Sequence, residues 1–283
     1  INAFIVSVIC IGLLKKKSFN SNEKILLFLG CSRFAYFCII WVRAFILIIY
    51  PWLYYVNSIP QLSSATHSFL NFSHLWVSSG LSVFYCIKIA NFRHSCFNFL
   101  KAKIDRIVPW LLLGSVLLSL SISILLYNIT GELTCNSNTT TLGNFWKLRF
   151  KMDKNYLSIL FINGFGFATA FLAVIFSALL LLFSLYRHKR RMQANSVKNV
   201  SMEAHIKAMK SILSFFFLYS LNFTASVLSL VYISKKENPL VLFITALQYI
   251  FPSIHSLILI FSNPKLEKTL RRTLLCVKCK VCS

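Results

Sequence analysis

Acidic side chains are scarce in this chain. Its 283 residues include 7 Asp and Glu against 30 Lys and Arg, and charged residues make up 13% of the whole. A soluble domain carries about 25% charged residues, so the composition excludes a soluble enzyme. The acidic residues also fall in loops or at the ends of apolar segments. Proton pumps and cation transporters usually need membrane-embedded Asp or Glu, and these functions are therefore disfavoured.

A pair of cysteines able to form an outer disulfide is also lacking. On the topology given below, Cys135 is the one outer-loop cysteine among 9, because the others fall in apolar segments or face the reducing cytosol. Cys276, Cys279 and Cys282 have metal-like spacing near the C-terminus, but three ligands without a fourth make a poor zinc site. Palmitoylated or plain reduced thiols are the alternatives. We expect no metal and no cofactor.

The formal net charge of +23 raises the question of nucleic-acid binding. A nucleic-acid module gathers Lys and Arg on one folded face, whereas here they occur in short runs between apolar segments. Hydrophobic residues make up 57% of the chain, so most side chains must face lipid or one another. A membrane surface explains the basic runs better, and no nucleic-acid partner is expected.

Long apolar runs are abundant and predict an all-α fold, a seven-transmembrane helix bundle. A helix that crosses a hydrocarbon core needs about 20 apolar residues. The transmembrane domain covers residues 1–262, and a basic cytoplasmic tail covers 263–283. The predicted helices lie at about 1–14, 25–50, 65–90, 107–127, 156–186, 212–233 and 240–261.

The first apolar run, residues 1–14, would span only about 21 Å as a helix. We interpret it as the inner part of a helix that is truncated in this chain. A cleaved signal peptide is the alternative, but the basic residues follow the apolar run here, and in a signal peptide they precede it.

The orientation follows from the basic residues, because Lys and Arg concentrate in cytoplasmic loops. With the N-terminus outside, 22 of the 30 Lys and Arg lie on the inner side and six on the outer side. This topology also places the glycosylation sequons that begin at Asn128 and Asn138 in the second outer loop.

Two arginines, Arg33 and Arg43, lie inside the second apolar run. A charged side chain in a membrane is costly and marks a functional site by default. Arg33 lies about two and a half turns from the cytoplasmic end, and no carboxylate is available within the membrane. We expect neutral partners for its guanidinium and name Asn2, Ser32 and Ser256. Arg43 lies nearer the outer boundary, where it can reach lipid headgroups.

Several segments resemble the type 2 taste receptors, the bitter-sensing G-protein-coupled receptors. They are Ser32-Arg33, Leu81-Ser-Val-Phe-Tyr-Cys-Ile-Lys-Ile-Ala90, Ser184-Leu-Tyr-Arg-His-Lys-Arg-Arg-Met-Gln193, Ala204-His-Ile-Lys-Ala-Met-Lys-Ser-Ile-Leu-Ser-Phe-Phe216 and Pro252-Ser-Ile-His-Ser-Leu-Ile-Leu-Ile-Phe-Ser-Asn-Pro-Lys-Leu266. The resemblance covers essentially the whole chain. It implies a multi-pass plasma-membrane receptor that binds bitter small-molecule agonists and activates a gustducin-type heterotrimeric G protein, without enzymatic activity.

The resemblance also implies roles for single residues. The implied ligand-binding residues are Trp76, Gly80, Asn163, Asn222, Thr245, Gln248 and Tyr249. The implied activation switch comprises Asn2, Arg33, Tyr219, His255 and Ser256. The implied G-protein contacts are Tyr85, Lys88, Arg187, His188, Arg191, His205, Lys207 and Lys210.

The chain departs from the family pattern in two places. The family often has Pro-Phe midway in its fifth helix, where this chain has Ala173-Val174, and a Tyr-x-x-Tyr pair in the sixth, where this chain reads Tyr219-Ser-Leu-Asn222. Gly80 replaces a residue that is often polar and would enlarge the pocket.

Simpler roles stay open for these residues. Trp76 is also suited to an anchor at the membrane interface. The basic inner residues also satisfy the positive-inside rule and bind anionic lipid. A vomeronasal or other chemosensory receptor shares the seven-span plan, and a membrane transporter is the alternative from a different class.

Overall fold

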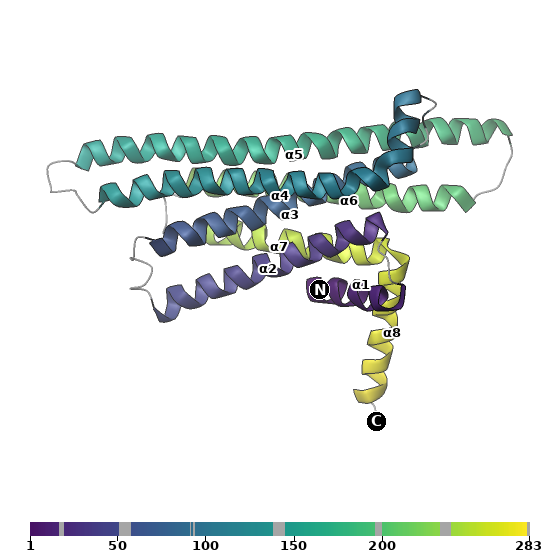
Figure 1. Cartoon of the computed structure of the whole chain (residues 1–283), viewed down its shortest axis with the longest axis horizontal. Coiled ribbons are helices and arrows are strands. Elements are labelled where there is room, and N and C mark those ends of the chain that lie inside the picture. Colours follow the sequence, from purple (N-terminus) through teal and green to yellow (C-terminus); the bar gives the residue numbers. More distant parts are fainter. Residues whose placement is uncertain are drawn as a thin grey trace. The chain divides into compact units, whose positions relative to one another are not determined.

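Every secondary-structure element in the described part of the chain is a helix. The structure is a computed structural model that describes residues 1–16, 20–50, 58–90, 92, 94–137, 145–195, 200–232 and 239–281. Figure 1 shows the helices in order along these residues. They are α1 (Asn2–Lys16), α2 (Ser21–Ile49), α3 (Ser58–Ile89), α4 (Ser95–Ser137), α5 (Phe145–Asn195), α6 (Val200–Tyr232), α7 (Pro239–Ser262) and α8 (Pro264–Val281).

Several helices run beyond the apolar windows that predict them. Helix α4 begins twelve residues before the expected 107–127 window, and α5 begins eleven residues before 156–186. A helix satisfies its own backbone hydrogen bonds in water as well as in lipid, so nothing requires it to end at the membrane boundary. For this reason Asn128, expected in an outer loop, lies within α4, and the expected tail contains α8.

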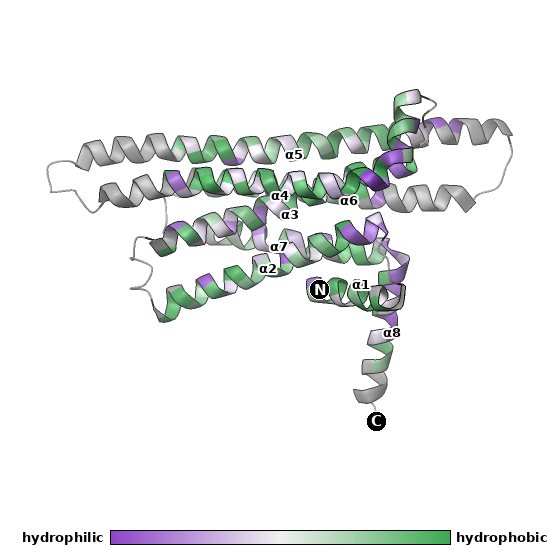
Figure 2. Ribbon diagram, viewed as in Figure 1, coloured by the Kyte–Doolittle hydropathy of each residue, from purple (hydrophilic) through white to green (hydrophobic). Residues whose placement is uncertain are grey.

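The described helices contain apolar segments of two lengths. Within the described residues, three segments are long and apolar enough to cross a membrane: Ser21–Ile46, Ser95–Ile129 and Leu157–Ser184. Shorter apolar helical segments occur at Asn2–Gly12, Ile212–Leu228 and Ala246–Ser262. Figure 2 shows the apolar residues along α2, α4 and α5 and hydrophilic residues where α8 begins. Helix α3 is rich in Ser and also carries His and Gln, which lower its hydropathy.

The chain forms two compact units. The first comprises Ile1–Cys31, Ser79–Val108 and Phe171–Ser283, and the second comprises Ser32–Ser78 and Pro109–Ala170. Helices α1, α6, α7 and α8 belong to the first unit, while α2 to α5 contribute residues to both.

Small side chains allow the helices of the first unit to pack closely. Gly30 of α2 lies against α1, since a Cβ placed there would meet Val6 Cγ2 at 3.0 Å. Small residues at such contacts let helix backbones approach one another. Buried side chains of α3, α5 and α6 form one core cluster, and those of α6 and α7 form another. The first contains Cys86, Ala90, Ala178, Leu181 and Ile212, and the second contains Ala225, Ile244 and Phe251.

The start of α8 is encoded locally. Asn263 lies just before α8, and its Oδ1 accepts hydrogen bonds from the backbone N–H of Lys265 at 3.0 Å and of Leu266 at 3.4 Å. Pro264 follows as the first helical residue, where its missing N–H costs nothing. Leu266 is fully buried, and Lys265 Nζ lies 2.6 Å from Glu23 Oε1 of α2. The cap, the buried leucine and the ion pair hold α8 against the rest of this unit.

In the second unit, an aromatic contact joins α3 and α5. Phe72 is fully buried, and its ring centroid lies 5.6 Å from that of Phe167. Gly166 leaves room for the Phe72 ring, because a Cβ at that position would come within 2.6 Å of it. Ser123 of α4 donates a hydrogen bond to the carbonyl oxygen of Ala65 in α3 at 2.7 Å.

We expect Gly166→Ala to destabilise the folded protein, because the buried Phe72 ring would have to move. The matched control is Gly164→Ala, where a Cβ meets nothing within 4 Å. Both changes gain the same helix propensity, so the difference between them isolates the clash at about 1–3 kcal/mol. Thermal unfolding of the two purified variants in detergent measures it. Equal melting temperatures would contradict the close packing.

Candidate functional site

Arg33 is buried and hydrogen-bonded within the second unit. Its side chain is 2% exposed, and Nη2 donates to Ser78 Oγ of α3 at 3.0 Å. Ser78 donates its own proton to the carbonyl oxygen of His74 at 2.6 Å. The hydroxyl lone pairs are therefore left to accept from the guanidinium. The charge is met by a neutral oxygen that is already polarised by a second hydrogen bond.

Ser78 is a partner of Arg33 that the sequence-based candidates did not include. The available signal was the polar Ser78-Ser79 pair inside an otherwise apolar stretch of α3. Two of the predicted candidates, Asn2 and Ser256, bond to each other. Ser256 is fully buried, and its Oγ lies 2.7 Å from Asn2 Oδ1 and 2.9 Å from the carbonyl oxygen of Pro252. This contact joins α1 to α7 across 254 positions of sequence.

Three aromatic rings pack together in the second unit, one of them on His74, whose carbonyl oxygen accepts from Ser78. The Tyr36 ring centroid lies 5.1 Å from those of His67 and His74. Within the described residues, neither His67 Nε2 nor His74 Nε2 has a hydrogen-bond partner. Trp76 is half-buried, and its indole Nε1 also lacks a partner among the residues described. This part of α3 therefore holds several polar atoms that are shielded from water and able to bond.

Tyr219 and His255, the predicted switch residues of α6 and α7, belong to one cluster of aromatic rings in the first unit. The Phe215 centroid lies 4.3 Å from His255 and 5.5 Å from Tyr219. Phe171 of α5 stacks on Tyr219 at 5.9 Å. The Tyr219 hydroxyl is buried and has no hydrogen-bond partner in the described part of the chain. Phe171 and Phe215 were not predicted, because an apolar ring gives no signal in a sequence with 27 Phe.

The predicted ligand-binding residues are divided between the two units. Trp76 and Asn163 belong to the second, where the Asn163 amide donates to the carbonyl oxygen of Ile159 at 2.8 Å. The first unit contains the buried Gly80 and Asn222, the half-buried Tyr249, and Gln248, whose Nε2 donates to Ser226 Oγ at 3.2 Å. The side chain of Thr245 lies outside the described residues.

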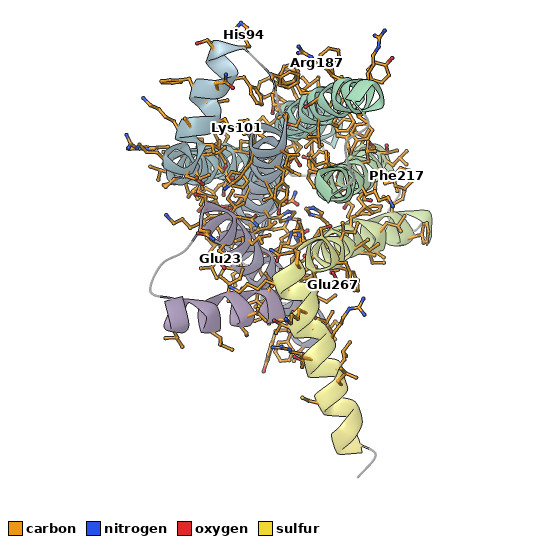
Figure 3. The ribbon with its side chains drawn as sticks, turned by 90° about the vertical axis from the view of Figure 1, so that its right-hand side faces the viewer. Glu23, His94, Lys101, Arg187, Phe217 and Glu267 are labelled. Atoms are coloured by element: carbon orange, nitrogen blue, oxygen red, sulfur yellow. The ribbon has the colours of Figure 1, made fainter. Side chains whose placement is uncertain are left out.

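All the residues predicted to contact a G protein belong to the first unit. Tyr85 donates to Asn22 Oδ1 at 3.1 Å, and Lys88 Nζ lies 3.6 Å from Asp105 Oδ1. Arg187 is half-buried and Lys210 is exposed. Figure 3 views this unit from the side where the labelled Lys101 and Arg187 lie. The side chains of His188, Arg191, His205 and Lys207 lie outside the described residues.

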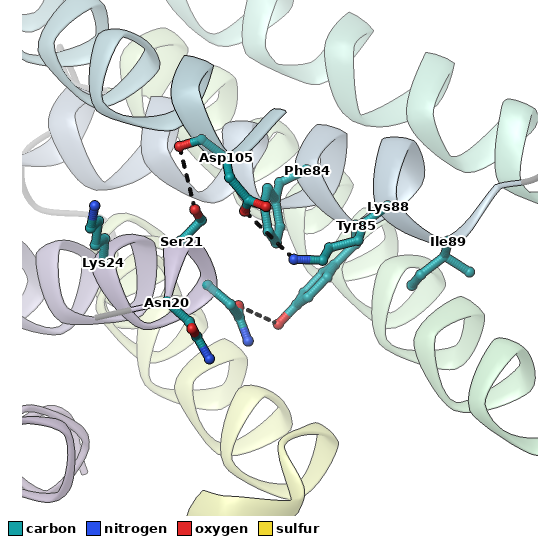
Figure 4. A pocket seen from close by; sticks show the side chains of 9 residues that line it. Asn20, Ser21, Lys24, Phe84, Tyr85, Lys88, Ile89 and Asp105 are labelled. Atoms are coloured by element: carbon teal, nitrogen blue, oxygen red, sulfur yellow. Dashed lines mark hydrogen bonds and ion pairs between the residues drawn. The ribbon is translucent and has the colours of Figure 1, made fainter. Parts of the chain in front are cut away.

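A pocket of about 620 Å³ opens beside Tyr85 and Lys88 (Figure 4). Its walls come from the start of α2, the end of α3 and the first part of α4. The lining residues are Asn20, Ser21, Asn22, Lys24, Phe84, Tyr85, Lys88, Ile89 and Asp105. The sequence did not predict this pocket.

The two predicted glycosylation sites differ in what the structure describes. Asn128 is exposed on α4. Asn138 lies outside the described residues.

The sequence matches known proteins along nearly its whole length. The family described as Taste receptor protein (TAS2R) matches residues 1–278. Taste receptor type 2 member 2 of Homo sapiens is 32% identical over 99% of this chain and 92% of its own length. Member 7 of Pan troglodytes is 34% identical over 94% of this chain and 85% of its own length. Member 9 of Homo sapiens is 34% identical over 98% of this chain and 89% of its own length. The chain therefore belongs to the type 2 taste receptor family, a family of seven-transmembrane G-protein-coupled receptors.

Proposed function

We propose that this receptor lies in the plasma membrane, detects bitter small molecules and activates a gustducin-type heterotrimeric G protein. The observation that carries this proposal is the buried Arg33–Ser78 contact, in which a charged group is held inside the transmembrane region by a hydroxyl oxygen. Such a group has to be maintained against its desolvation cost, which is the mark of a functional element in a membrane.

We propose agonist-contacting residues in each of the two units, on α3 and α5 in the second and on α3, α6 and α7 in the first. Trp76 offers a large aromatic face and a buried indole N–H without a partner among the described residues. It can hold an apolar molecule by contact area, a cation by its ring face and a carbonyl by its N–H. Gly80 and Asn222 are buried, and Gln248 is half-buried, so they add space and amide groups suited to uncharged ligands.

The activation switch that we propose comprises contacts within each unit. In one, Arg33 binds Ser78. In the other, Ser256 binds Asn2, and the Phe215 ring lies between Tyr219 and His255. An agonist that binds the active arrangement better shifts the population toward it. Packed rings and buried hydrogen bonds have few alternative arrangements, which suits a two-state change.

The G-protein surface that we propose lies at the basic helix ends. Lys88, Arg187 and Lys210 are all in the first unit, and Lys88 and Lys210 are exposed. Positive side chains there complement acidic residues of a cytoplasmic partner and speed its association.

The direct experiment expresses the receptor with a chimeric G protein that links gustducin-type receptors to calcium release, and screens a panel of bitter compounds. We expect at least one compound to evoke a calcium signal that depends on both the receptor and the chimera. A response that persists without the chimera, or ion flux through the receptor itself, would contradict the proposal.

We expect Arg33→Ala to reduce the agonist-evoked signal more than about tenfold, because a hydrogen bond to a charged group is lost. The matched control is Arg43→Ala, a change of the same charge ten positions further along α2, where the side chain is only half-buried. Calcium imaging with surface labelling of each variant measures signalling and delivery separately. Normal signalling by Arg33→Ala at normal surface level would remove it from the switch.

We expect Trp76→Ala to raise the concentration of agonist needed for half-maximal response by about tenfold or more, with a different factor for each compound. Loss of the ring removes contact area from the ligand and leaves G-protein coupling intact. Trp41→Ala is the control, since Trp41 is 75% exposed on α2. An agonist profile unchanged by Trp76→Ala, or changed equally by both substitutions, would exclude Trp76 from the binding site.

A further inference from the structure

The pocket beside Tyr85 and Lys88 is lined by three helices, and in each of them the lining residues lie near a predicted membrane boundary. Asn20 to Lys24 precede the apolar window predicted at 25–50, Lys88 and Ile89 lie at the end of α3, and Asp105 precedes the window predicted at 107–127. Apolar segments end where the hydrocarbon ends, so the pocket is at the depth of the lipid headgroups. With the proposed orientation, on which this inference rests, it faces the inner leaflet.

The lining of this pocket combines amines with hydrogen-bonding groups of both kinds. Lys24 and Lys88 supply ammonium groups, Asn20 and Asn22 supply amides, and Asp105 supplies a carboxylate. Ser21 Oγ donates to the backbone carbonyl oxygen of Asp105 at 3.5 Å. A purely anionic ligand would be repelled by the Asp105 carboxylate, whereas a phosphorylated polyol presents hydroxyl groups to it and phosphates to the lysines.

Neither lysine is committed strongly to another group. Lys88 pairs with Asp105 at 3.6 Å, but the two side chains are 51% and 62% exposed, and such a pair contributes little to stability. Lys88 can therefore turn toward a phosphate at small cost. The backbone N–H of Lys24 donates to the carbonyl oxygen of Asn20 at 3.0 Å, whereas its half-buried side chain at the pocket wall makes no hydrogen bond or ion pair within the described residues.

The apolar part of the lining sets the shape of the pocket. Phe84 is fully buried, and Lys88 Nζ lies 5.1 Å from its ring centroid. In Figure 4, Lys88 reaches from α3 toward Asp105 and Tyr85 reaches toward α2. A volume of about 620 Å³ is within the range of small-molecule sites. Basic pockets between transmembrane helices on the cytoplasmic side are suited to phosphoinositide headgroups.

We propose that this pocket, lined by Lys24, Lys88, Asp105 and the amides of Asn20 and Asn22, binds the phosphorylated inositol headgroup of an inner-leaflet phosphoinositide. The site is separate from the proposed agonist site. It holds Lys88 and Tyr85, two residues that the family resemblance implies for G-protein contact, so the lipid would act where the helix ends meet the cytosol.

The test titrates the purified full-length chain, in nanodiscs of phosphatidylcholine alone, with dioctanoyl phosphatidylinositol bisphosphate, dioctanoyl phosphatidylserine and inositol trisphosphate. Microscale thermophoresis reads the dissociation constants. We expect the bisphosphate lipid to bind more tightly than phosphatidylserine. A stronger signal from the lipid than from inositol trisphosphate would assign the membrane as the source, and equal binding would assign the soluble phosphate to the same site.

Variants locate the binding. Lys24→Gln is expected to weaken bisphosphate binding by about tenfold, because one charge-assisted contact is lost. Lys103→Gln removes the same charge from an exposed position of α4 outside the pocket and is expected to change nothing. Lys88→Gln serves as a second pocket variant. Thermal unfolding reports whether each variant is folded.

Three results would overturn the proposal: no bisphosphate binding by the unaltered chain, equal affinity for phosphatidylserine, or equal weakening by Lys24→Gln and Lys103→Gln. Binding is measured without agonist or G protein, so a negative result leaves the calcium response of the receptor unaffected. The two proposals can therefore fail separately.

Discussion

The cost of holding the guanidinium of Arg33 away from water is the constraint on which the proposed mechanism depends. The seven acidic residues of the sequence lie outside its apolar runs, so a carboxylate cannot neutralise this charge within the transmembrane region. Ser78 supplies a neutral acceptor for this charge. Its hydroxyl donates to the carbonyl oxygen of His74 and accepts a hydrogen bond from Arg33 Nη2. A neutral partner binds a cation less strongly than a carboxylate would. An equilibrium between two arrangements is easier to shift when the contact that holds one of them is of moderate strength.

Hydroxyl groups elsewhere in the helices follow a simpler rule. Ser115, Ser177 and Ser220 each donate to the carbonyl oxygen four residues earlier, at distances of 2.7–2.9 Å. Such bonds satisfy the side chain within its own helix, so a serine in an apolar segment needs no neighbour. Ser256 and Ser123 differ, because they reach other helices. The buried Trp76 indole and Tyr219 hydroxyl differ again, since no described residue bonds to them. Of these groups, Trp76 belongs to the proposed agonist site, and Tyr219 and Ser256 belong to the proposed switch.

The inner ends of the helices add a second layer of polar contacts. Glu23 pairs with Lys265 across α2 and α8, and Lys88 pairs with Asp105 across α3 and α4. Both acids are among only seven in the chain. Asp105 is 62% exposed, whereas the Glu23 side chain is 17% exposed, and each pairs with a lysine that is itself partly exposed. The excess of basic residues beyond these pairs remains available to anionic lipid or to a cytoplasmic partner.

The sequence by itself determined the class of the protein. Its apolar runs, the distribution of its basic residues and its taste-receptor-like motifs predict a seven-transmembrane receptor. Composition and spacing decide which segments can enter a membrane. Helix limits were less predictable, as α4 and α8 show, since a helix continues wherever its own hydrogen bonds are satisfied. The partner of Arg33, the Asn2–Ser256 bond across 254 positions and the pocket between α2, α3 and α4 were decided only by tertiary structure. Each depends on which faces of separate helices meet. Periodicity shows which residues share a face of one helix but not which other helix that face contacts. From sequence alone, one serine or phenylalanine in an apolar segment cannot be told from another.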